Sequence, residues 1–183
     1  MAEAAVQTRA ATYQVDTAHS FVEFSVKHLV VATARGRFTS FDGELTFDPA
    51  DPSAGSVRVS IDADSVDTRD AKRDEHLRSN DFFGAGDDPQ ITFASTRIEP
   101  RRGDDYNVFG NLTIRGVTKE VLLDTTFNGV AVSPWGQHVA SFSATTEISR
   151  KDFGVNWNAA LEGGGVMVSD NVKISLDIEA IQQ

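Results

Sequence analysis

The chain contains no cysteine among its 183 residues. This absence excludes a disulfide framework, a thiolate metal site and a cysteine nucleophile. Basic residues are also scarce, since 17 Lys and Arg stand against 27 Asp and Glu and the formal net charge is -10. A nucleic-acid-binding protein needs clustered Lys and Arg, and so does a polybasic membrane surface. The composition argues against both classes, and we interpret the acidity as a contribution to solubility.

Long apolar runs are missing as well. No stretch approaches the roughly 18 consecutive apolar residues of a membrane-spanning helix, and residues 1–16 show neither the basic nor the apolar region of a secretory signal. From the chain as written we expect a cytoplasmic protein without a membrane span. Residues 1–11 are rich in alanine and carry no periodic pattern, so they are predicted to form a flexible N-terminal tail.

What the chain does contain is a regular alternation of apolar and polar residues, the pattern of half-buried β-strands. The alternation is cleanest over 55–64, where Val59 and Ile61 share one face. Over 21–28 the apolar face ends in His28, and a lone histidine at such a place is typical of a hydrogen-bonded rim residue. The predicted strands are 12–15, 21–28, 38–47, 55–64, 91–98, 106–115, 118–132, 138–149 and 171–181.

One stretch, Arg69–Phe83, replaces this alternation with a helical signal. Its acidic residues gather toward the start and its later basic residues suit the helix dipole. We expect a short helical crossover whose apolar end either covers one end of the β-structure or anchors the crossover to the core. A weaker helical turn is predicted over 155–161, and Gly36 is expected to break the mixed segment 29–37.

Closely spaced strands, tight turns and one helix favour an all-β fold, an extended antiparallel up-and-down β-barrel with one short helical crossover. One-sided alternation also fits a β-sandwich, but the length of several strands favours the barrel. The chain has no internal repeat and no linker long enough to divide it. Residues 12–183 are therefore predicted to form a single domain.

Six phrases follow one another along this chain. They are DTAHSFVEFSVKH at 16–28, GRF at 36–38, RDEHLRSNDFF at 73–83, PQITFAST at 89–96, GNLTIRGVTK at 110–119 and RKDFG at 150–154. Each is weak alone, but in this order they closely resemble the YceI-like family of lipocalin-like proteins, from about Tyr13 to the C-terminus. The resemblance implies an extended barrel with a helix at its side and a long hydrophobic interior that binds polyisoprenoid or related amphiphilic lipids. It supplies no catalytic residues.

Catalytic and metal-binding patterns are weak by comparison. Asp16, His19 and Ser20 look like a hydrolytic triad, but neighbours in a strand point to opposite faces, and no Gly-x-Ser-x-Gly elbow occurs. Asp16 and Ser20 are better interpreted as hydrogen-bonding the turn backbone. The four histidines lack metal-site spacing, and Gly163–Gly165 does not follow a strand and open a helix as a nucleotide-binding loop would. We expect no enzyme activity, no metal and no cofactor.

What remains is the binding of a hydrophobic ligand. The 12 phenylalanines suit a packed core or a cavity lining equally well, and the family resemblance favours the cavity. We expect non-catalytic binding, carriage or sequestration of a long-chain polyisoprenoid or related amphiphilic lipid, such as a polyprenyl phosphate or an isoprenoid quinone. The alternative is an enzyme acting on a lipid-like substrate in the same pocket. Homodimer formation is left open.

The expected ligand-binding residues lie on the apolar strand faces, on the helical crossover and at strand ends. They are Phe24, Val26, His28, Phe38, Phe41, Val59, Ile61, Leu77, Phe82, Phe83, Ile91, Phe93, Arg150 and Phe153. The lipid head group is expected at the rim, against His28 and Arg150, because each ends a strand. A phosphate would prefer the arginine, whereas a quinone carbonyl needs only a neutral donor. A competing interpretation pairs Arg150 with a nearby acid such as Asp152.

Overall fold

The computed structural model describes residues 10–87, 89–162 and 164–183. A flexible tail was predicted over residues 1–11. Residues 1–9 lie outside the described part of the chain, so for them the tail stays a prediction. Ala11 already belongs to the first strand, which therefore begins one residue earlier than expected.

The described chain is dominated by β-strands. The strands are β1 (Ala11–Val15), β2 (Phe21–His28), β3 (Ala32–Phe38), β4 (Phe41–Phe47), β5 (Ser56–Asp62), β6 (Val66–Asp67), β7 (Gln90–Pro100), β8 (Asp105–Ile114), β9 (Val117–Val132), β10 (His138–Ser149) and β11 (Val168–Gln182). One α-helix, α1 (Ala71–Arg78), follows β6, and short 3₁₀ turns occupy Pro52–Ala54, Ala63–Ser65 and Arg150–Phe153.

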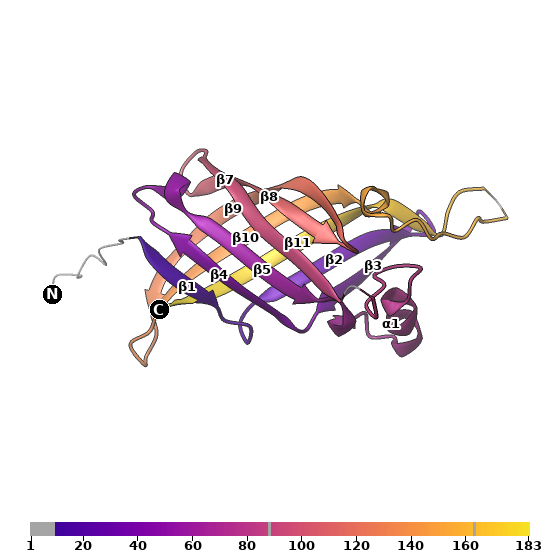
Figure 1. Ribbon diagram of the computed structural model, residues 1–183, viewed down its shortest axis with the longest axis horizontal. Coiled ribbons are helices and arrows are strands. Elements are labelled where there is room, and N and C mark those ends of the chain that lie inside the picture. Colours follow the sequence, from indigo (N-terminus) through magenta and orange to yellow (C-terminus); the bar gives the residue numbers. More distant parts are fainter. Residues whose placement is uncertain (1–9, 88, 163) are drawn as a thin grey trace.

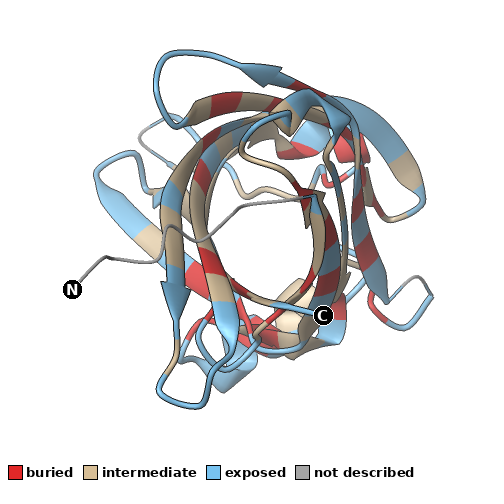
Figure 2. Cartoon of the chain, turned by 90° about the vertical axis from the view of Figure 1, so that its left-hand side faces the viewer, coloured by how far each residue is buried: buried red, intermediate tan, exposed pale blue. Residues whose placement is uncertain are grey.

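Backbone hydrogen bonding closes the sheet into a barrel, which is seen from the side in Figure 1 and from one end in Figure 2. Strands β4, β5, β7, β8, β9, β10 and β11 pair in succession, and β1 closes the circle by pairing with both β4 and β11. All these pairings are antiparallel. The closed eight-stranded barrel confirms the predicted fold class over the β-sandwich.

Strands β2 and β3 lengthen the barrel wall at one end. β2 pairs with β11 beyond the point where β1 leaves it, and β3 pairs with β2. β1 and β2 thus pair with successive parts of β11. β3 then pairs with β2, and β4 pairs with β1. This arrangement makes the barrel longer than its eight closing strands alone would.

The stretch 38–47, expected to be one strand, is divided between β3 and β4 in the structure. Thr39 and Ser40 lie between the two strands. The hydroxyl and the backbone N–H of Thr39 both donate to the carbonyl of Ser65. These bonds hold Thr39 against the segment that precedes β6, and they interrupt the strand. The single-strand prediction is wrong because this contact is tertiary, and a periodic pattern contains no information about tertiary contacts.

The segment 29–37, expected to be broken by Gly36, instead contains most of β3. Gly36 lies inside the strand, where the Phe24 ring and the Thr68 methyl group occupy the space that a Cβ would need. A glycine in a strand often marks such a close approach. The breaker interpretation is therefore wrong, and Gly36 makes room for an aromatic ring.

The helical turn predicted over 155–161 is also wrong. Among the residues described, the only short helix near this position is the 3₁₀ turn Arg150–Phe153. Residues 155–159 form no helical hydrogen bonds. The guanidinium of Arg150 donates to the carbonyls of Val155 and Trp157. Those carbonyls are consequently satisfied by a side chain rather than by a helix.

Helix α1 is shorter than the predicted Arg69–Phe83 and ends at Arg78. The Asp70 carboxylate caps its N-terminus by accepting from two backbone N–H groups of the first turn. The Arg78 guanidinium donates to the carbonyls of Asp64 and Val66, which fastens the helix beside β6 at the lower right of Figure 1. None of the helices in the described ranges has the length and apolar character to cross a membrane.

Candidate ligand-binding cavity

A cavity of about 600 Å³ lies inside the barrel. Its volume falls within the roughly 300–1,000 Å³ of small-molecule sites. Nearly all of its wall is apolar, because the inward positions of each strand carry the apolar members of the alternating pattern. On β11, for example, Val172, Ile174, Leu176 and Ile178 line it, while Lys173 and Glu179 do not.

Every residue named from the sequence as a candidate for ligand binding lines this cavity. Phe24, Val26 and His28 come from β2, Phe38 from β3, Phe41 from β4, Val59 and Ile61 from β5, Leu77 from α1, Phe82 and Phe83 from the turn after it, Ile91 and Phe93 from β7, and Arg150 and Phe153 from the 3₁₀ turn. The structure thus brings residues from eight separate segments to one surface. Their role in binding a ligand stays a prediction.

An aromatic cluster closes the cavity at the end near the two chain ends. The ring of Phe47 lies 4.9 Å from that of Phe127, 5.1 Å from that of Phe142 and 6.0 Å from that of Tyr106, measured between centroids. Burial raises the pKa of the Tyr106 phenol, with a smaller contribution from Asp104, so the ring stays neutral. This end therefore offers a ligand an apolar floor.

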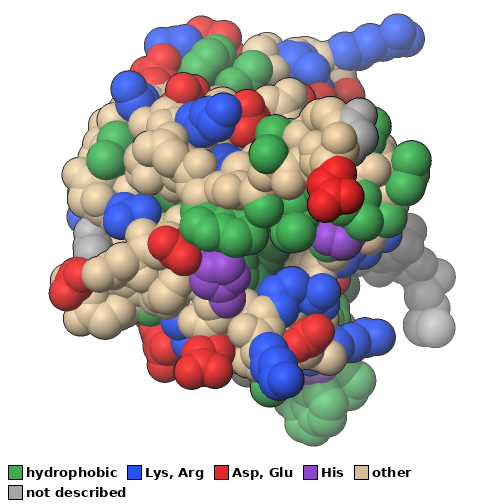
Figure 3. Space-filling model, turned by 90° about the vertical axis from the view of Figure 1, so that its right-hand side faces the viewer, with side chains coloured by type: hydrophobic (Ala, Val, Ile, Leu, Met, Phe, Trp, Pro, Cys, Tyr) green, Lys and Arg blue, Asp and Glu red, His purple; other side chains and the backbone are tan. Residues whose placement is uncertain are grey.

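The opposite end of the cavity carries two further aromatic groups. Phe24, Phe38 and Phe83 pack together with centroid distances of 5.5 to 6.4 Å. Beside them the Trp157 ring lies 4.7 Å from His76 and also contacts Phe82. Seen from this end, hydrophobic side chains form a band across the centre, bordered by histidine side chains and by both basic and acidic ones (Figure 3). We call this end the mouth of the cavity.

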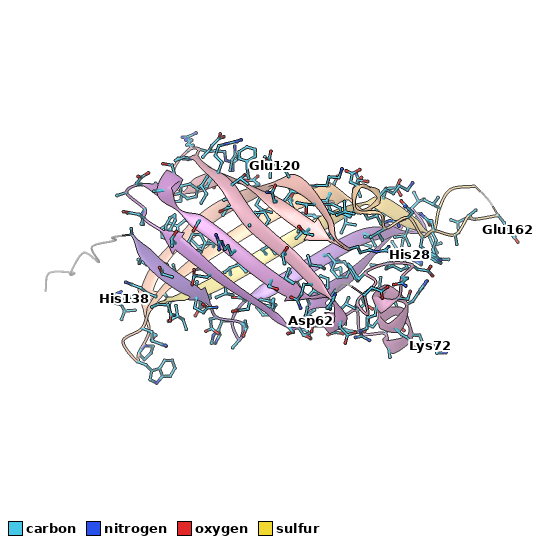
Figure 4. All side chains as sticks on the ribbon, in the orientation of Figure 1. His28, Asp62, Lys72, Glu120, His138 and Glu162 are labelled. Atoms are coloured by element: carbon cyan, nitrogen blue, oxygen red, sulfur yellow. The ribbon has the colours of Figure 1, made fainter. Side chains whose placement is uncertain are left out.

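Polar and charged side chains gather at the mouth rather than in the interior. The cavity lining there includes His28, Arg35, Lys72 and His76, and Figure 4 shows His28 and Lys72 at the same end of the molecule. Arg35 and Lys72 form no ion pair within the described part of the chain. An amphiphile inserted tail first would leave its polar group beside these cations and imidazoles.

The surroundings of Arg150 bear on its predicted role at the head group, which stays a prediction. Its side chain is 6% exposed, and its guanidinium donates to the carbonyls of Val155, Trp157 and Ser169. Its carboxylate neighbour is Asp170, 3.6 Å away, and not Asp152. Burial lowers the pKa of Arg150, while Asp170 opposes that shift. The guanidinium is occupied with holding the 155–170 segment, so little of it is free for a head group.

Several lining residues were missed from the sequence. Trp157 lies in the segment expected to be helical, Lys72 is a polar residue of the helical crossover, and Arg35 lies in the segment 29–37 that was expected to be mixed. The signal for Trp157 was its rarity, since the chain has two tryptophans. No local pattern could have placed Lys72 and Arg35, because they meet at the mouth only through the packing of α1 against the strand ends.

The residues that resemble a hydrolytic triad do not assemble one. Ser20 is buried, and its hydroxyl donates to the carbonyl of Glu179 and accepts from the Glu179 N–H. The Asp16 carboxylate accepts from the backbone N–H of Ala18 and contacts Nδ1 of His19 at 2.8 Å. The predicted bond to the turn backbone is present for Asp16, whereas Ser20 bonds the backbone of Glu179 on β11 instead. None of these side chains lines the cavity.

One group of potential metal ligands occurs in the described ranges. Its ligand atoms lie within 4.8 Å of one another and belong to Asp16, His19 and Glu179. The hydrogen bond between Asp16 and His19 accounts for their closeness without an ion. That bond is the main reason that the pKa of Asp16 is lowered and that the pKa of His19 is raised.

The Asp16–His19 pair is expected to make folding stability depend on pH, and the two pKa shifts give the direction of that dependence. The contribution of His19 is full below its unfolded pKa of 6.5 and is lost as pH rises through its higher folded value. The contribution of Asp16 is present above its unfolded pKa of 3.8 and is lost as pH falls through its lower folded value. We expect an NMR titration of the His19 ring to show a midpoint above 6.5.

The Asp16→Asn variant should return the His19 midpoint toward its ordinary value. Glu179→Gln, which removes only a weaker charge contribution 4.0 Å from the ring, should lower it less. An unchanged midpoint in Asp16→Asn would show that the hydrogen bond does not persist in solution.

Comparison with known proteins gives consistent matches over almost the whole chain. The model of the YceI-like domain family matches residues 13–180. A UPF0312 protein of Pseudomonas paraeruginosa is 41% identical over 179 residues, covering 97% of this chain and 90% of that protein. A UPF0312 protein of Pectobacterium atrosepticum is 41% identical over 176 residues, with 95% and 88% covered.

Solved structures share the same barrel. BcnA of Burkholderia cenocepacia superposes with a TM-score of 0.80 at 30% identity, covering 90% of this chain and 98% of that one. The YCEI protein of Campylobacter jejuni gives 0.74 at 32% identity, covering 86% and 90%. A polyisoprenoid-binding domain from Saccharophagus degradans gives 0.71 at 16% identity, covering 96% and 100%, and its likeness concerns the fold alone.

Proposed function

Because this chain belongs to the YceI-like family, we propose that it binds a long-chain isoprenoid lipid inside the barrel, without acting on it chemically. The observation that carries this proposal is the apolar cavity of about 600 Å³, floored by aromatic rings at one end and bordered by cations at the other. Burial of apolar surface is the dominant favourable contribution to such binding. The domain from Saccharophagus degradans has the same fold and is a polyisoprenoid-binding domain, which supports this class of ligand.

In the proposed complex the lipid tail lies along the inward faces of β2, β5 and β7. These faces contribute Phe24, Val26, Val59, Ile61 and Phe93. The polar group lies at the mouth against His28, near Lys72 and Arg35 rather than Arg150. A polyprenyl phosphate would use the two cations, and an isoprenoid quinone would use a neutral imidazole donor.

The direct test is to identify what the protein carries. The native protein is purified without detergent, extracted with organic solvent, and the extract is analysed by mass spectrometry. We expect an isoprenoid-tailed lipid in amounts comparable to the protein, and none in an extract of an unrelated protein purified alongside. The same purified protein, assayed with and without added metal ions on a prenyl lipid, should return the lipid unchanged. Turnover would support the rival enzyme function.

The second test is the dependence of affinity on tail length. Burying apolar chain contributes roughly 0.8 kcal/mol per CH₂ before ordering costs, so each isoprene unit should add about 2–3 kcal/mol gross and much less net. We expect the affinity for prenyl ligands to rise with each added unit and to level off when the tail fills the cavity. A titration followed by Trp157 fluorescence in a Trp135→Phe background measures this series. Affinity that does not depend on tail length would contradict binding in the interior.

Cytoplasmic location and homodimer formation stay predictions from the sequence. Cell fractionation and sedimentation of the purified chain test them separately from ligand binding.

A further inference from the structure

An apolar turn projects at the mouth of the cavity. Between β2 and β3, the side chains of Leu29, Val30 and Val31 are 40%, 68% and 87% exposed. Val166, 45% exposed, belongs to the neighbouring segment, and the backbone N–H of Leu29 donates to the carbonyl of Met167. We call Leu29–Val31 together with Val166 the apolar tip. Three adjacent exposed apolar residues are an error in a soluble surface unless they have a function.

The backbone of the apolar tip is unfavourable for the residues that it carries. Leu29 and Val30 adopt φ values of 51° and 66°, in the left-handed region. Gly, Asn and Asp occupy this region readily, whereas a β-branched residue there is a genuine outlier. Asparagine or glycine would suit both the backbone and the solvent better than Val30 does. Val30 occupies this position although both its backbone conformation and its exposure to solvent are unfavourable for valine.

The apolar tip is continuous with the proposed binding site. His28, directly before the turn, and Met167, directly after Val166, both line the cavity. A surface that covers the tip therefore also faces the mouth. By contrast, the other strongly exposed apolar pair, Val132 and Trp135, lies on the β9–β10 turn near His138 at the opposite end in Figure 4.

Charges of both signs lie around the mouth. The chain carries a net charge of -10, and Lys27, Arg35 and Lys72 flank the mouth without an ion-pair partner among the residues described. The acidic residues Glu23 and Asp70 belong to the cavity lining as well, so the mouth is not strongly charged in either sense. Contact with a surface of lipid head groups is accordingly tolerated, and apolar insertion rather than charge must supply most of the attraction.

We propose that the apolar tip docks on a lipid bilayer and places the mouth of the barrel against it. The exposed valines enter the boundary between head groups and acyl chains, and Lys27, Arg35 and Lys72 lie at the level of the head groups. A lipid then passes between bilayer and cavity without crossing water. Docking itself depends on the tip alone, whereas the passage of lipid rests on the proposed function.

The test compares two double variants in flotation with vesicles of phosphatidylcholine, with and without phosphatidylglycerol. Val30→Asn/Val31→Asn removes the apolar tip with a residue that tolerates the left-handed region. Val132→Asn/Trp135→Asn removes the exposed apolar pair at the opposite end. We expect the tip variant to lower the vesicle partition coefficient roughly ten- to a hundredfold, on the scale of burying two valine side chains. The opposite-end variant should bind as the parent does.

Folding and ligand binding serve as internal checks. Because Val30→Asn relieves an unfavourable φ, the tip variant should unfold at the same or a higher temperature than the parent, and it should bind a short, water-dispersed prenyl ligand with unchanged affinity. In a Trp135→Phe background, brominated lipids should quench Trp157, which lies at the mouth. Phosphatidylglycerol should strengthen binding only modestly.

Three outcomes overturn docking. They are a parent that does not float with either vesicle, equal losses in the two double variants, and a tip variant whose change is the loss of a concentration-dependent dimer seen by sedimentation. Prenyl binding without vesicle binding rejects docking and leaves the proposed function intact. Vesicle binding that depends on the tip, in a protein that takes up no prenyl ligand, rejects the proposed function and leaves docking intact.

Discussion

Replacing Arg150 with alanine is expected to lower the free energy of unfolding by about 3–5 kcal/mol, because it leaves three largely buried carbonyls unsatisfied at about 1–3 kcal/mol each. The guanidinium is nearly fully buried and supplies hydrogen bonds to the carbonyls of Ser169, Val155 and Trp157. Alanine leaves these acceptors without a donor, while Asp170 keeps Lys151 as its partner. The segment that carries Trp157 should lose its fixed position first.

Lys151→Ala is the matched control for this loss. Lys151 is the next residue, is about half exposed at 51%, and pairs with the same Asp170 at 2.9 Å. Exposed ion pairs contribute about 0–1 kcal/mol, so this variant should be nearly neutral. Arg150→Lys should behave like alanine more than like arginine, because an ammonium group lacks the planar fork that reaches several carbonyls at once.

Urea unfolding at pH 7 measures all three variants. The distance between Nη2 of Arg150 and Oδ1 of Asp170 is 3.6 Å, and neither atom has a hydrogen-bond partner. Asp170 therefore contributes by charge alone, and most of the expected loss comes from the three carbonyls. A loss below about 1 kcal/mol for Arg150→Ala, the value typical of an exposed pair, would show that the guanidinium is not committed as described. His28→Ala, which breaks no such network, is the cleaner test of head-group contact.

Replacing Val59 with tryptophan is expected to reduce affinity for long isoprenoids by roughly three- to tenfold, because the indole displaces about one isoprene unit, whose net contribution is well below its gross value of about 2–3 kcal/mol. Val59 faces inward on β5, opposite Gly43 on β4 and Phe93 on β7. Short prenyl ligands that still fit beside the new ring should lose much less. The level at which affinity stops rising with tail length should also move to shorter tails.

Arg58→Trp is the matched control, one residue along the same strand. Arg58 is exposed and points away from the cavity, so the same side chain placed there should leave the length dependence unchanged. Ile61→Trp should repeat the effect of Val59→Trp, since Ile61 also lines the interior. Equal losses for short and long tails in both inward variants would mean that tryptophan distorts the wall rather than fills the space.

The inward lining was predictable because side chains alternate strictly across a strand. Once Val59 faces the interior, Val57 and Ile61 must do so too, whatever the rest of the chain does. The end of the alternation also placed His28 at a rim. The alternation of apolar and polar residues does not show which strand pairs with which. Neither the pairing of β1 with both β4 and β11 nor the handover from β1 to β2 along β11 could be obtained from it.

The errors have physical causes of the same kind. Gly36 was interpreted as a breaker because local propensity carries no information about the Phe24 ring that occupies the space beside it. The segment 155–161 was interpreted as helical because nothing local shows that Arg150 takes its carbonyls. Both depend on side-chain contacts that a periodic pattern does not encode, although the partners are only 5 to 12 residues apart in the sequence. The cations of the mouth were missed for the same reason.

The pairing of β1 with β11 has a consequence for biosynthesis. During synthesis the ribosome releases β1 early, but its partner on one side emerges only after nearly all the other strands. Until then the sheet is open along an edge, and its apolar face has no enclosed interior. Contacts between segments so distant in the chain also make folding slow. The enclosed cavity therefore exists only once β11 has joined β1, so a ligand can be surrounded by the complete wall only after that pairing forms.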